Sequence, residues 1–537
     1  MIKKVKGDKL KKSYLNSVLK LSMGILVSSS SLYATDYEMA KTIIDTKCTT
    51  CHTGSTSSGL SRISDQRKTL EGWIMTLKRM KEDHNLFLSK KENELVLKYL
   101  SDTQGLNYDE TTDYRYILEK TPNYQENTNL DGQFTEVCAR CHSAARVTLQ
   151  KRTKAEWDKL VDFHLGKYPT TEYQSLARDR DWYGIAKEEI VPYLAKHFNN
   201  DKEFKLQKND FSGSWSFYGH RLGEGDFTLT MNMKKISDDK YKVSIDGSYL
   251  DGREIKGLGE AKIYSGYEYR ATVKIDGIKH KQIFSFDKKS GKLLGSMFET
   301  LHPEEHSTLS GVKSGTKSTI LGVYPKSIKA GTTTTLTISG NNLKGNVKLS
   351  NGLKLNKVIE RSSSKIVLDV TASTKYSSKA IDIKVGSATL NDDLVVYKKI
   401  DGLKVYPTYA IARVGDGGGK MPKQHAIFEA HGYLAGKDGK IGTSDDISLG
   451  KVDAKWSVAP FDERSKIDED VKFTGDMDSF SGRFTPSFAG PNPKRRFGTN
   501  NAGNLKVIAT YKDGASTLKA DSHLIVTVQK WVNPPID

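Results

Sequence analysis

The sequence has little cysteine and almost no long apolar runs. Only four cysteines occur in 537 residues, which is too few for a disulfide-rich scaffold. After residue 27, no stretch has the length and apolar character needed to cross a bilayer. The part of the chain after residue 208 also lacks a nucleophile elbow, a phosphate-binding loop and an H-E-x-x-H motif. These absences exclude a polytopic membrane protein and argue against hydrolytic or nucleotide chemistry in that part.

Acidic residues are fewer than basic ones, with 65 Asp and Glu against 83 Lys and Arg, and the formal net charge is +18. Residues 1–34 hold seven lysines and one aspartate, a net of +6, which leaves +12 for the remainder. No stretch shows a nucleic-acid-binding motif or a concentrated basic face. We therefore interpret the lysines as a solvated surface that can steer an acidic partner, and we expect no nucleic-acid ligand.

The N-terminus has the pattern of a secretory signal. A lysine-rich segment precedes the mostly apolar stretch Leu15–Val27, and small residues then lead to Ala34. We expect a signal peptide over 1–34, cleavage near Ala34, a periplasmic location and no membrane span after cleavage. Leu32 is an imperfect residue at its position before the cut, so the exact site stays open. An uncleaved membrane anchor is the alternative.

The four cysteines all fall in two C-x-x-C-H motifs, which are the attachment signature of c-type haem. The motifs consist of Cys48, Cys51 and His52, and of Cys138, Cys141 and His142. Each thiol pair forms two thioethers to haem vinyl groups, and the adjacent histidine becomes the proximal iron ligand. A disulfide or zinc interpretation is disfavoured, because no further cysteine completes a zinc ligand set. We therefore expect two covalent haem c groups.

An internal repeat suggests the distal iron ligands. Met80 follows Trp73 by seven residues, and His164 follows Trp157 by the same distance. Apolar residues recur at helical spacing around both pairs, so each tryptophan should share a helix face with its partner. We predict His52 and Met80 as the iron ligands of the first haem, and His142 and His164 as those of the second.

Three other residues compete for these distal positions. Met75 and His84 are the alternatives to Met80, and His197 is the alternative to His164. A His/Met pair usually has a higher reduction potential, because the thioether favours ferrous iron. Two six-coordinate haems of unlike potential suit directional electron transfer rather than substrate binding at iron.

The chain should form several domains, because 537 residues exceed the size of one hydrophobic core. We predict a mainly α dihaem cytochrome c domain over 35–205, closed by a helix over 179–198 that Pro192 kinks. From 206 on, alternating apolar residues and recurrent turn signals predict all-β domains. These are an antiparallel β-barrel over 206–317 and two immunoglobulin-like β-sandwiches over 318–397 and 398–537.

Two segments of the β region are compatible with either a packing role or a binding role. The aromatic-rich segment 264–270 is interpreted as barrel filling. The loop 438–446 is rich in oxygen donors but misses the EF-hand spacing, so we interpret it as a tight turn and leave calcium binding open.

The order of these features resembles the α, haem-bearing subunit of quinohaemoprotein amine dehydrogenase over essentially the whole mature chain. The resemblance rests on the two haem segments and on a set of shorter motifs along the chain. These motifs are Tyr168–Tyr173, Tyr264–Arg270, Phe484–Pro486, Gly490–Pro493, Asn500–Asn501 and Gln529–Trp531.

The resemblance implies a function shared among several subunits. A β-propeller subunit and a small γ subunit would assemble with this chain, and the γ subunit would carry a cysteine tryptophylquinone that oxidises primary amines. Electrons would pass through the two haems to a blue copper protein or a cytochrome c. This division is consistent with the cysteine count, because haem attachment would use every thiol of this chain. The amine and the natural acceptor are not encoded in recognisable motifs here.

Two alternatives belong to other functional classes. A dihaem cytochrome c peroxidase-like enzyme would need a haem with an open distal position, and Met80 and His164 argue against one. A free-standing dihaem electron carrier would use its β domains to bind surfaces. The presence or absence of a γ-like gene nearby separates this last alternative from the amine dehydrogenase subunit.

Overall fold

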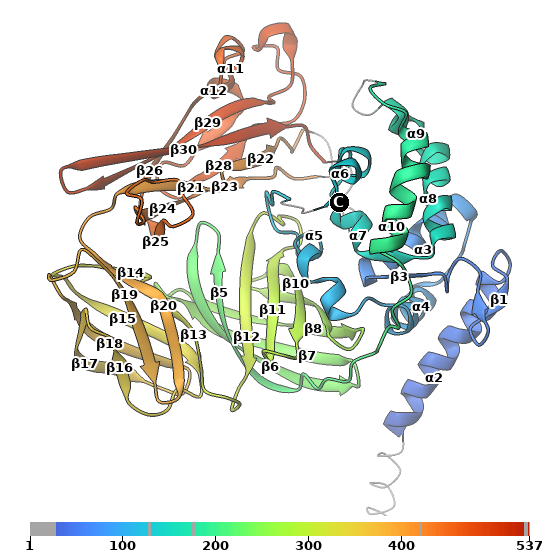
Figure 1. Cartoon of the computed structure of the whole chain (residues 1–537), viewed down its shortest axis with the longest axis horizontal. Coiled ribbons are helices and arrows are strands. Elements are labelled where there is room, and N and C mark those ends of the chain that lie inside the picture. Colours follow the sequence, from blue (N-terminus) through green and yellow to red (C-terminus); the bar gives the residue numbers. More distant parts are fainter. Residues whose placement is uncertain (1–27, 127–129, 174–177, 418–420, 531–534, 536–537) are drawn as a thin grey trace, which may run out of the picture.

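The computed structural model describes residues 28–126, 130–173, 178–417, 421–530 and 535. A helical region lies against one side of a β-barrel, and two further β regions lie beside and above the barrel (Figure 1). Of the predicted signal peptide, residues 1–27 lie outside the described residues. Over the described residues, the structure contains no helix with both the length and the apolar character that a membrane span requires.

The N-terminal region contains helices joined by long irregular segments and short strands. Its helices are α2 (Ser28–Ile43), η1 (Ile44–Cys48), α3 (Leu70–His84), α4 (Lys90–Thr103), η2 (Tyr108–Glu110), η3 (Thr112–Tyr114), α5 (Arg115–Leu118), α6 (Gly132–Cys138), α7 (Ala145–Thr148), α8 (Lys154–Lys167), η4 (Pro169–Tyr173), α9 (Trp182–Ile185), η5 (Ala186–Ile190) and α10 (Val191–His197). Its strands are β1 (Gly54–Ser55), β2 (Gly59–Leu60), β3 (Gln66–Lys68) and β4 (Gln150–Arg152). The prediction of a mainly α domain therefore overstates the helical content.

The closing helix begins at Trp182, later than predicted, and contains a π-helical turn directly before the segment that holds Pro192. It consists of α9, the π-helical turn η5 and α10, and Pro192 lies in the first turn of α10. A proline there needs no intrahelical N–H bond, and the wider π turn before it relieves the clash of the ring with the preceding carbonyls. Ile190, Val191 and Leu194 pack from this helix into the core around Trp157.

Eight antiparallel strands close into a barrel, which confirms the predicted barrel. The strands are β5 (Gly213–Arg221), β6 (Gly225–Ser237), β7 (Lys240–Tyr249), β8 (Glu254–Tyr264), β9 (Glu268–Ile275), β10 (Ile278–Asp287), β11 (Lys292–Glu299) and β12 (His306–Lys313). Alternate side chains point inward and fill the interior, with Trp215, Tyr241 and Phe284 among the buried rings. A small barrel of this strand number is filled by its own side chains.

The third region consists of two four-stranded sheets around one apolar core. Its strands are β13 (Thr319–Tyr324), β14 (Ser327–Lys329), β15 (Thr333–Asn341), β16 (Val347–Leu349), β17 (Leu353–Arg361), β18 (Lys365–Ala372), β19 (Ser378–Val385) and β20 (Ala388–Tyr397). One sheet has the order β13-β15-β18-β17 and the other β14-β20-β19-β16.

The C-terminal region combines three sheets with two short helices. Its elements are β21 (Gly402–Tyr406), β22 (Tyr409–Arg413), β23 (Ala426–Ile427), β24 (Glu429–Leu434), β25 (Ile447–Val452), β26 (Lys455–Pro460), α11 (Glu463–Ile467), α12 (Asp470–Phe473), β27 (Gly475–Met477), β28 (Arg483–Pro486), η6 (Arg496–Gly498), β29 (Gly503–Asp513) and β30 (Ser516–Thr527). The immunoglobulin-like topology of this region and of the third region stays a prediction.

A buried ion-pair network joins the helical region to the barrel. Arg115 of α5 donates to Glu268 of β9 at 3.1 Å, and to Glu119 at 2.8 Å. Arg270, also on β9, donates to Glu71 of α3 at 2.7 Å. Burial opposes ionisation of Glu268, but the charges of Arg115 and Arg270 outweigh it and lower the pKa of Glu268 to about 2. The network therefore stays charged and fixes the two regions against each other.

The segment 264–270 contributes to this interface as well as to the barrel. Tyr269 lies in the barrel core, as the sequence predicted. Tyr267, in contrast, donates its hydroxyl to the Leu106 carbonyl of the helical region at 2.8 Å. Tyr264 packs against the apolar cluster of α3 and α4. The interpretation as barrel filling was thus correct for one ring only, because period-two alternation does not reveal which domain covers the outer face.

The substitution Glu268→Gln should destabilise the junction between the helical region and the barrel. The amide removes the charge that Arg115 and Arg270 share and leaves each with a single carboxylate partner, Glu119 or Glu71, so we expect a loss at the lower end of the about 3–5 kcal/mol that breaking a buried pair costs. We expect the midpoint of thermal unfolding, followed by circular dichroism, to fall by roughly 6–12 °C for a loss near 3 kcal/mol. The control Glu254→Gln breaks an exposed pair with Lys256 and should leave the midpoint unchanged. Equal midpoints for the two variants would contradict a stabilising role of the network.

Candidate functional site

A duplicated strand–helix unit forms the centre of the N-terminal region. The short strands β3 and β4 pair antiparallel, with Gln66 opposite Arg152, and each leads into a helix. Thr69 caps α3 by accepting from the Gly72 N–H at 3.2 Å, and Thr153 caps α8 by accepting from the Glu156 N–H at 3.3 Å. Both caps satisfy donors that a helix N-terminus leaves free. The repeat seen in the sequence is therefore present in the structure.

One tryptophan anchors each helix of the repeat. The Trp73 indole N–H donates to the Gln104 carbonyl at 3.1 Å, and the Trp157 indole N–H donates to the Phe198 carbonyl at 3.2 Å. Both side chains are essentially inaccessible to solvent. Two helical turns after its tryptophan, α3 carries Met80 and α8 carries His164.

The two copies of the repeat differ in the order of the basic residues that precede the threonine caps. Thr69 and Thr153 are equivalent caps, so Lys68 corresponds to Arg152 and Arg67 corresponds to Lys151. Lysine and arginine therefore exchange places between the two copies, and the threonine caps define the register of the repeat.

The first C-x-x-C-H motif lines a cavity of about 540 Å³. Cys48 ends the helix η1, and the N–H groups of Cys51 and His52 donate to the Cys48 carbonyl at 3.1 and 2.9 Å. This tight turn brings both thiols and the imidazole to the cavity, which Met80 also lines. The volume falls within the range of about 300–1,000 Å³ that is typical of cofactor pockets.

The structure separates the competitors for the first distal position. His84 lines the same cavity as Met80 and remains an alternative. Met75 packs instead against the apolar cluster formed by Leu106, Ile117 and Leu149. Met75 is thus a core methionine.

Five basic side chains line the same cavity, namely Lys47, Arg62, Lys68, Arg79 and Arg152. Burial, and then the charges of Arg152 and Arg79, lower the pKa of Lys68 well below its ordinary value. Burial, followed by the charge of Arg79, also lowers the pKa of Arg152 to about 9. Glu156 and Asp83 line the cavity as well and offset part of this charge, and Glu156 pairs with Arg62 and Arg152. The five cations still outnumber the two carboxylates, and crowded buried cations are costly unless further anions join them. The cavity is therefore suited to a group that carries carboxylates, as haem does with its propionates.

The second motif lies on the other copy of the repeat. Helix α6 ends at Cys138, which packs against the cluster around Phe134 and Trp157. His142 and His164 are half-buried, and burial is the main cause that lowers the pKa of each. The charge of Arg146, and then that of His164, also lower the pKa of His142. His197, the competitor of His164, is exposed, and its ring packs on Tyr193 at a centroid distance of 4.6 Å.

The three histidines predicted as iron ligands share one hydrogen-bond pattern. The Nδ1 atom lies 2.9 Å from the Ser61 carbonyl in His52, 2.9 Å from the Ser143 carbonyl in His142 and 2.8 Å from the Leu160 carbonyl in His164. A carbonyl only accepts, so Nδ1 carries the proton in each ring. The Nε2 lone pair is left available, which is the arrangement that orients a metal-binding histidine.

All four cysteines are free thiols. Burial raises the pKa of Cys48 to about 11 and that of Cys138 to about 12. No disulfide therefore competes with thioether formation.

The two sites are neighbours through α8. Leu160 and Phe163 of this helix line the first cavity, and His164 belongs to the second site. The Arg79 guanidinium lies over the Phe163 ring, 5.5 Å from its centroid. The same helix thus forms part of both candidate sites.

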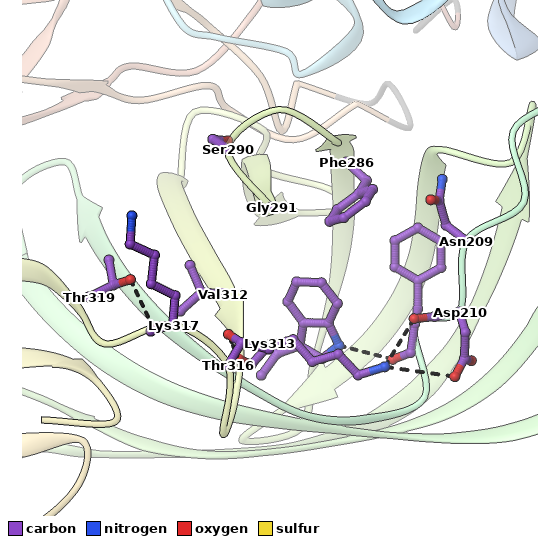
Figure 2. A pocket seen from close by; sticks show the side chains of 12 residues that line it. Asn209, Asp210, Phe286, Ser290, Gly291, Val312, Lys313, Thr316, Lys317 and Thr319 are labelled. Atoms are coloured by element: carbon purple, nitrogen blue, oxygen red, sulfur yellow. Dashed lines mark hydrogen bonds and ion pairs between the residues drawn. The ribbon is translucent and has the colours of Figure 1, made fainter. Parts of the chain in front are cut away.

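A second pocket, of about 310 Å³, lies at one end of the barrel (Figure 2). Several of its polar groups are bonded within the protein. The Trp215 indole N–H donates to the Phe211 carbonyl at 3.0 Å, and the Lys313 ammonium donates to the Asp210 carbonyl at 3.1 Å. The pocket is consistent with the end of a filled barrel, and we assign no chemistry to it.

The oxygen-rich loop 438–446 also satisfies its own acceptors. Asp445 accepts from the backbone N–H of Lys437 at 2.6 Å, and Asp446 accepts from the backbone N–H of Gly442 at 2.8 Å. The carboxylates are thus used to close the turn, in agreement with the interpretation as a tight turn.

Comparison with protein families gives four matches that together cover most of the chain. Residues 38–204 match "Quinohemoprotein amine dehydrogenase A, alpha subunit, haem binding". Residues 208–314, 317–398 and 403–536 match domains II, III and IV of the same alpha subunit. A comparison with curated proteins gave no match.

Solved structures resemble only a part of the chain. A redesigned β-barrel, mFAP1 bound to DFHBI, is 16% identical, with coverage of 19% of this chain and 90% of that one and a TM-score of 0.17. A biogenic amine-binding protein is 14% identical, with coverage of 20% and 67% and a TM-score of 0.17. The wild-type fluorescent protein UnaG is 15% identical, with coverage of 19% and 97% and a TM-score of 0.15. Scores this low support no functional inference.

Three observations agree with one another. They are the duplicated helix unit, the haem-binding family match over 38–204, and the matches of the three following regions to the same subunit. The chain therefore belongs to the family of quinohaemoprotein amine dehydrogenase α subunits, which contain a haem-binding domain and form part of an amine-oxidising oxidoreductase.

Proposed function

We propose that this chain is the electron-transfer subunit of a periplasmic quinohaemoprotein amine dehydrogenase and carries two covalent c-type haems. The observation that carries the proposal is the cavity that Cys48, Cys51, His52 and Met80 line together. These are the two thiols, the proximal imidazole and the distal thioether that one haem c requires. When bound, each haem supplies an iron that changes oxidation state by one electron.

The proposed roles of the site residues follow from their positions. Cys48, Cys51, Cys138 and Cys141 attach the cofactors, and His52, Met80, His142 and His164 ligate the irons. The carbonyls of Ser61, Ser143 and Leu160 hold the three imidazole rings in the tautomer that leaves Nε2 available. The buried cations Lys68 and Arg152 neutralise propionates of the first haem.

The oxidation of amines belongs to partner subunits in this proposal. A γ subunit would hold a cysteine tryptophylquinone that oxidises primary amines, and a β-propeller subunit would complete the complex. A periplasmic blue copper protein or cytochrome c would accept the electrons. The C-x-x-C-H motifs support this division, because they use all four thiols of the chain.

We also propose a division of the chain into a signal peptide over 1–34 and domains over 35–205, 206–317, 318–397 and 398–537. The β domains act as a scaffold and contact the partner subunits. The separate apolar cores of the barrel, the third region and the C-terminal region support these boundaries.

The proposed function predicts that a primary amine reduces the haems only in the assembled complex. We expect α-band absorption of ferrous haem to appear after the amine is added to the native complex, and no change when the amine is added to this chain alone. Reduction of the isolated chain would place amine oxidation on it, and an unresponsive complex would contradict the proposal. Peroxide turnover by the isolated chain would favour the peroxidase alternative.

The substitution Met80→Ala should alter the first haem without preventing its attachment. Loss of the thioether destabilises ferrous iron, so the reduction potential should fall by something on the order of 0.1 V, within the roughly 0.8 V over which axial ligands act. Redox titration and the near-infrared sulfur-to-iron band measure the change. Met75→Ala is the matched control and should leave both unchanged, since Met75 packs into the core. A normal spectrum in Met80→Ala with an altered one in His84→Ala would move the assignment to His84.

The substitution His164→Ala should open the distal position of the second haem. We expect a high-spin signal in the electron paramagnetic resonance spectrum of the oxidised protein, and two covalently attached haems by mass spectrometry. His197→Ala, which removes an exposed histidine two helices away, should leave the spectrum unchanged. The reverse pattern would assign His197 as the ligand.

A further inference from the structure

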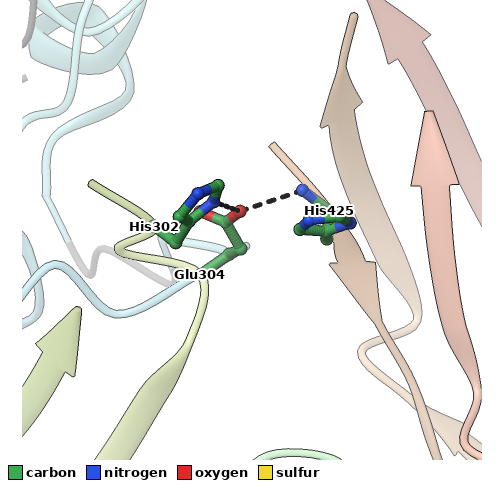
Figure 3. Close-up of side chains that lie close together, drawn as sticks. All are labelled: His302, Glu304 and His425. Atoms are coloured by element: carbon green, nitrogen blue, oxygen red, sulfur yellow. Dashed lines mark hydrogen bonds and ion pairs between the residues drawn. The ribbon is translucent and has the colours of Figure 1, made fainter. Parts of the chain in front are cut away.

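Two histidines and a glutamate from distant parts of the chain meet between the barrel and the C-terminal region (Figure 3). His302 and Glu304 belong to the connection from β11 to β12, and His425 directly precedes β23. More than a hundred residues of sequence, including the whole third region, separate the two contributions. The cluster lies outside the candidate haem sites described above.

One potential metal-ligating atom of each residue lies within 4.8 Å of the other two. Oε1 of Glu304 lies 3.1 Å from Nδ1 of His302, and it accepts from the backbone N–H of His425 at 3.0 Å. The two imidazole rings lie with their centroids 5.7 Å apart. These contacts hold the three side chains at a common centre.

Two buried atoms of the cluster have no hydrogen-bond partner in the part of the chain that the structure describes. They are Oε2 of Glu304, whose residue is 5% exposed, and Nδ1 of His425. A buried carboxylate oxygen without a donor is costly, and natural structures seldom leave one in place. Glu304 Oε2 and His425 Nδ1 both lack a hydrogen-bond partner among the described residues, and the His302 imidazole lies beside them. A bound cation would supply the missing partner for both atoms.

The nearby guanidinium groups are already neutralised by other carboxylates. Arg221 donates to Glu299 at 2.8 Å and to Glu305 at 2.9 Å, and Arg483 forms an ion pair with Glu305. The carboxylate of Glu304 is therefore not required by either arginine.

We propose that His302, Glu304 and His425 form a zinc site that clamps the barrel to the C-terminal region. Two imidazoles and one carboxylate are a donor set of zinc and related divalent transition metals, whereas calcium and magnesium prefer oxygen ligands alone. Three protein ligands leave a fourth position for water. A neutral His302 imidazole binds the metal through one ring nitrogen and keeps its proton on the other.

The clamp would reinforce hydrogen bonds that already cross the same domain boundary. Glu429 of β24 accepts from the Gly223 N–H at 2.9 Å and lies 3.0 Å from Nε2 of His220 on β5. These bonds tie the C-terminal region to one end of the barrel. A metal at the cluster would add a second attachment point, independent of the haem chemistry proposed above.

The test uses the full-length, haem-loaded chain after chelator treatment and titration with Zn²⁺ alone. We expect one tight equivalent of zinc, a rise in the unfolding midpoint, and no corresponding effect of Ca²⁺. His302→Ala, Glu304→Gln and His425→Ala should each weaken binding about 100-fold or more, since even the loss of an outer-shell partner costs about 10- to 100-fold. The control His523→Ala removes a histidine of the C-terminal region that stacks on Phe461, and it should bind zinc normally.

X-ray absorption at the zinc edge identifies the ligands without interference from haem iron. The proposal requires two imidazole nitrogens and a carboxylate oxygen in the first coordination shell. His302 is half-exposed, so His302→Ala should fold and provides a test even if the buried variants are unstable. Absence of a tight equivalent, or tight binding that survives in folded His302→Ala, would overturn the proposal.

Discussion

The three-residue ladder between β3 and β4 determines where the two halves of the candidate haem region lie. Each strand leads within one residue to a threonine cap, so the pairing sets the starting points of α3 and α8 together. The tryptophan on each helix then bonds to a carbonyl of a later segment and fixes the rotation of its helix. The positions of Met80 and His164 follow from these few hydrogen bonds. The same strands bring Lys68 and Arg152 to the first cavity.

The barrel supports this arrangement through charge as well as through packing. Its strand β9 presents Glu268 and Arg270 to α3 and α5, where they meet Glu71 and Arg115. Buried ion pairs contribute little net stability compared with apolar packing, but they penalise every orientation that leaves one charge without its partner. The network therefore acts mainly to select one relative orientation of helices and barrel. Such rigidity would suit the proposed electron transfer, because the distance between two haems must not vary.

The sequence predicted those features whose signal is local. The C-x-x-C-H motifs, the tryptophan-to-ligand spacing and the strand alternation of the barrel each lie within a few residues. The register of the basic residues in the repeat is defined only by the threonine caps, because lysine and arginine exchange places between the copies. The basic lining of the cavity was missed, because its residues come from separate elements and meet only after folding. The outward contacts of Tyr264 and Tyr267 were missed since alternation identifies a face but not its neighbour. The cluster of His302 with His425 has no sequence signal at all.

Helix α8 lines one candidate cavity with Leu160 and Phe163 and carries His164 toward the other site. A rigid helix shared by two candidate sites cannot tilt to suit one of them alone. Adjustment of either centre during evolution is therefore confined to exchanges of individual side chains that leave the axis of the helix in place. The duplication that produced the two similar helix units thus also limits how independently the two candidate sites can change.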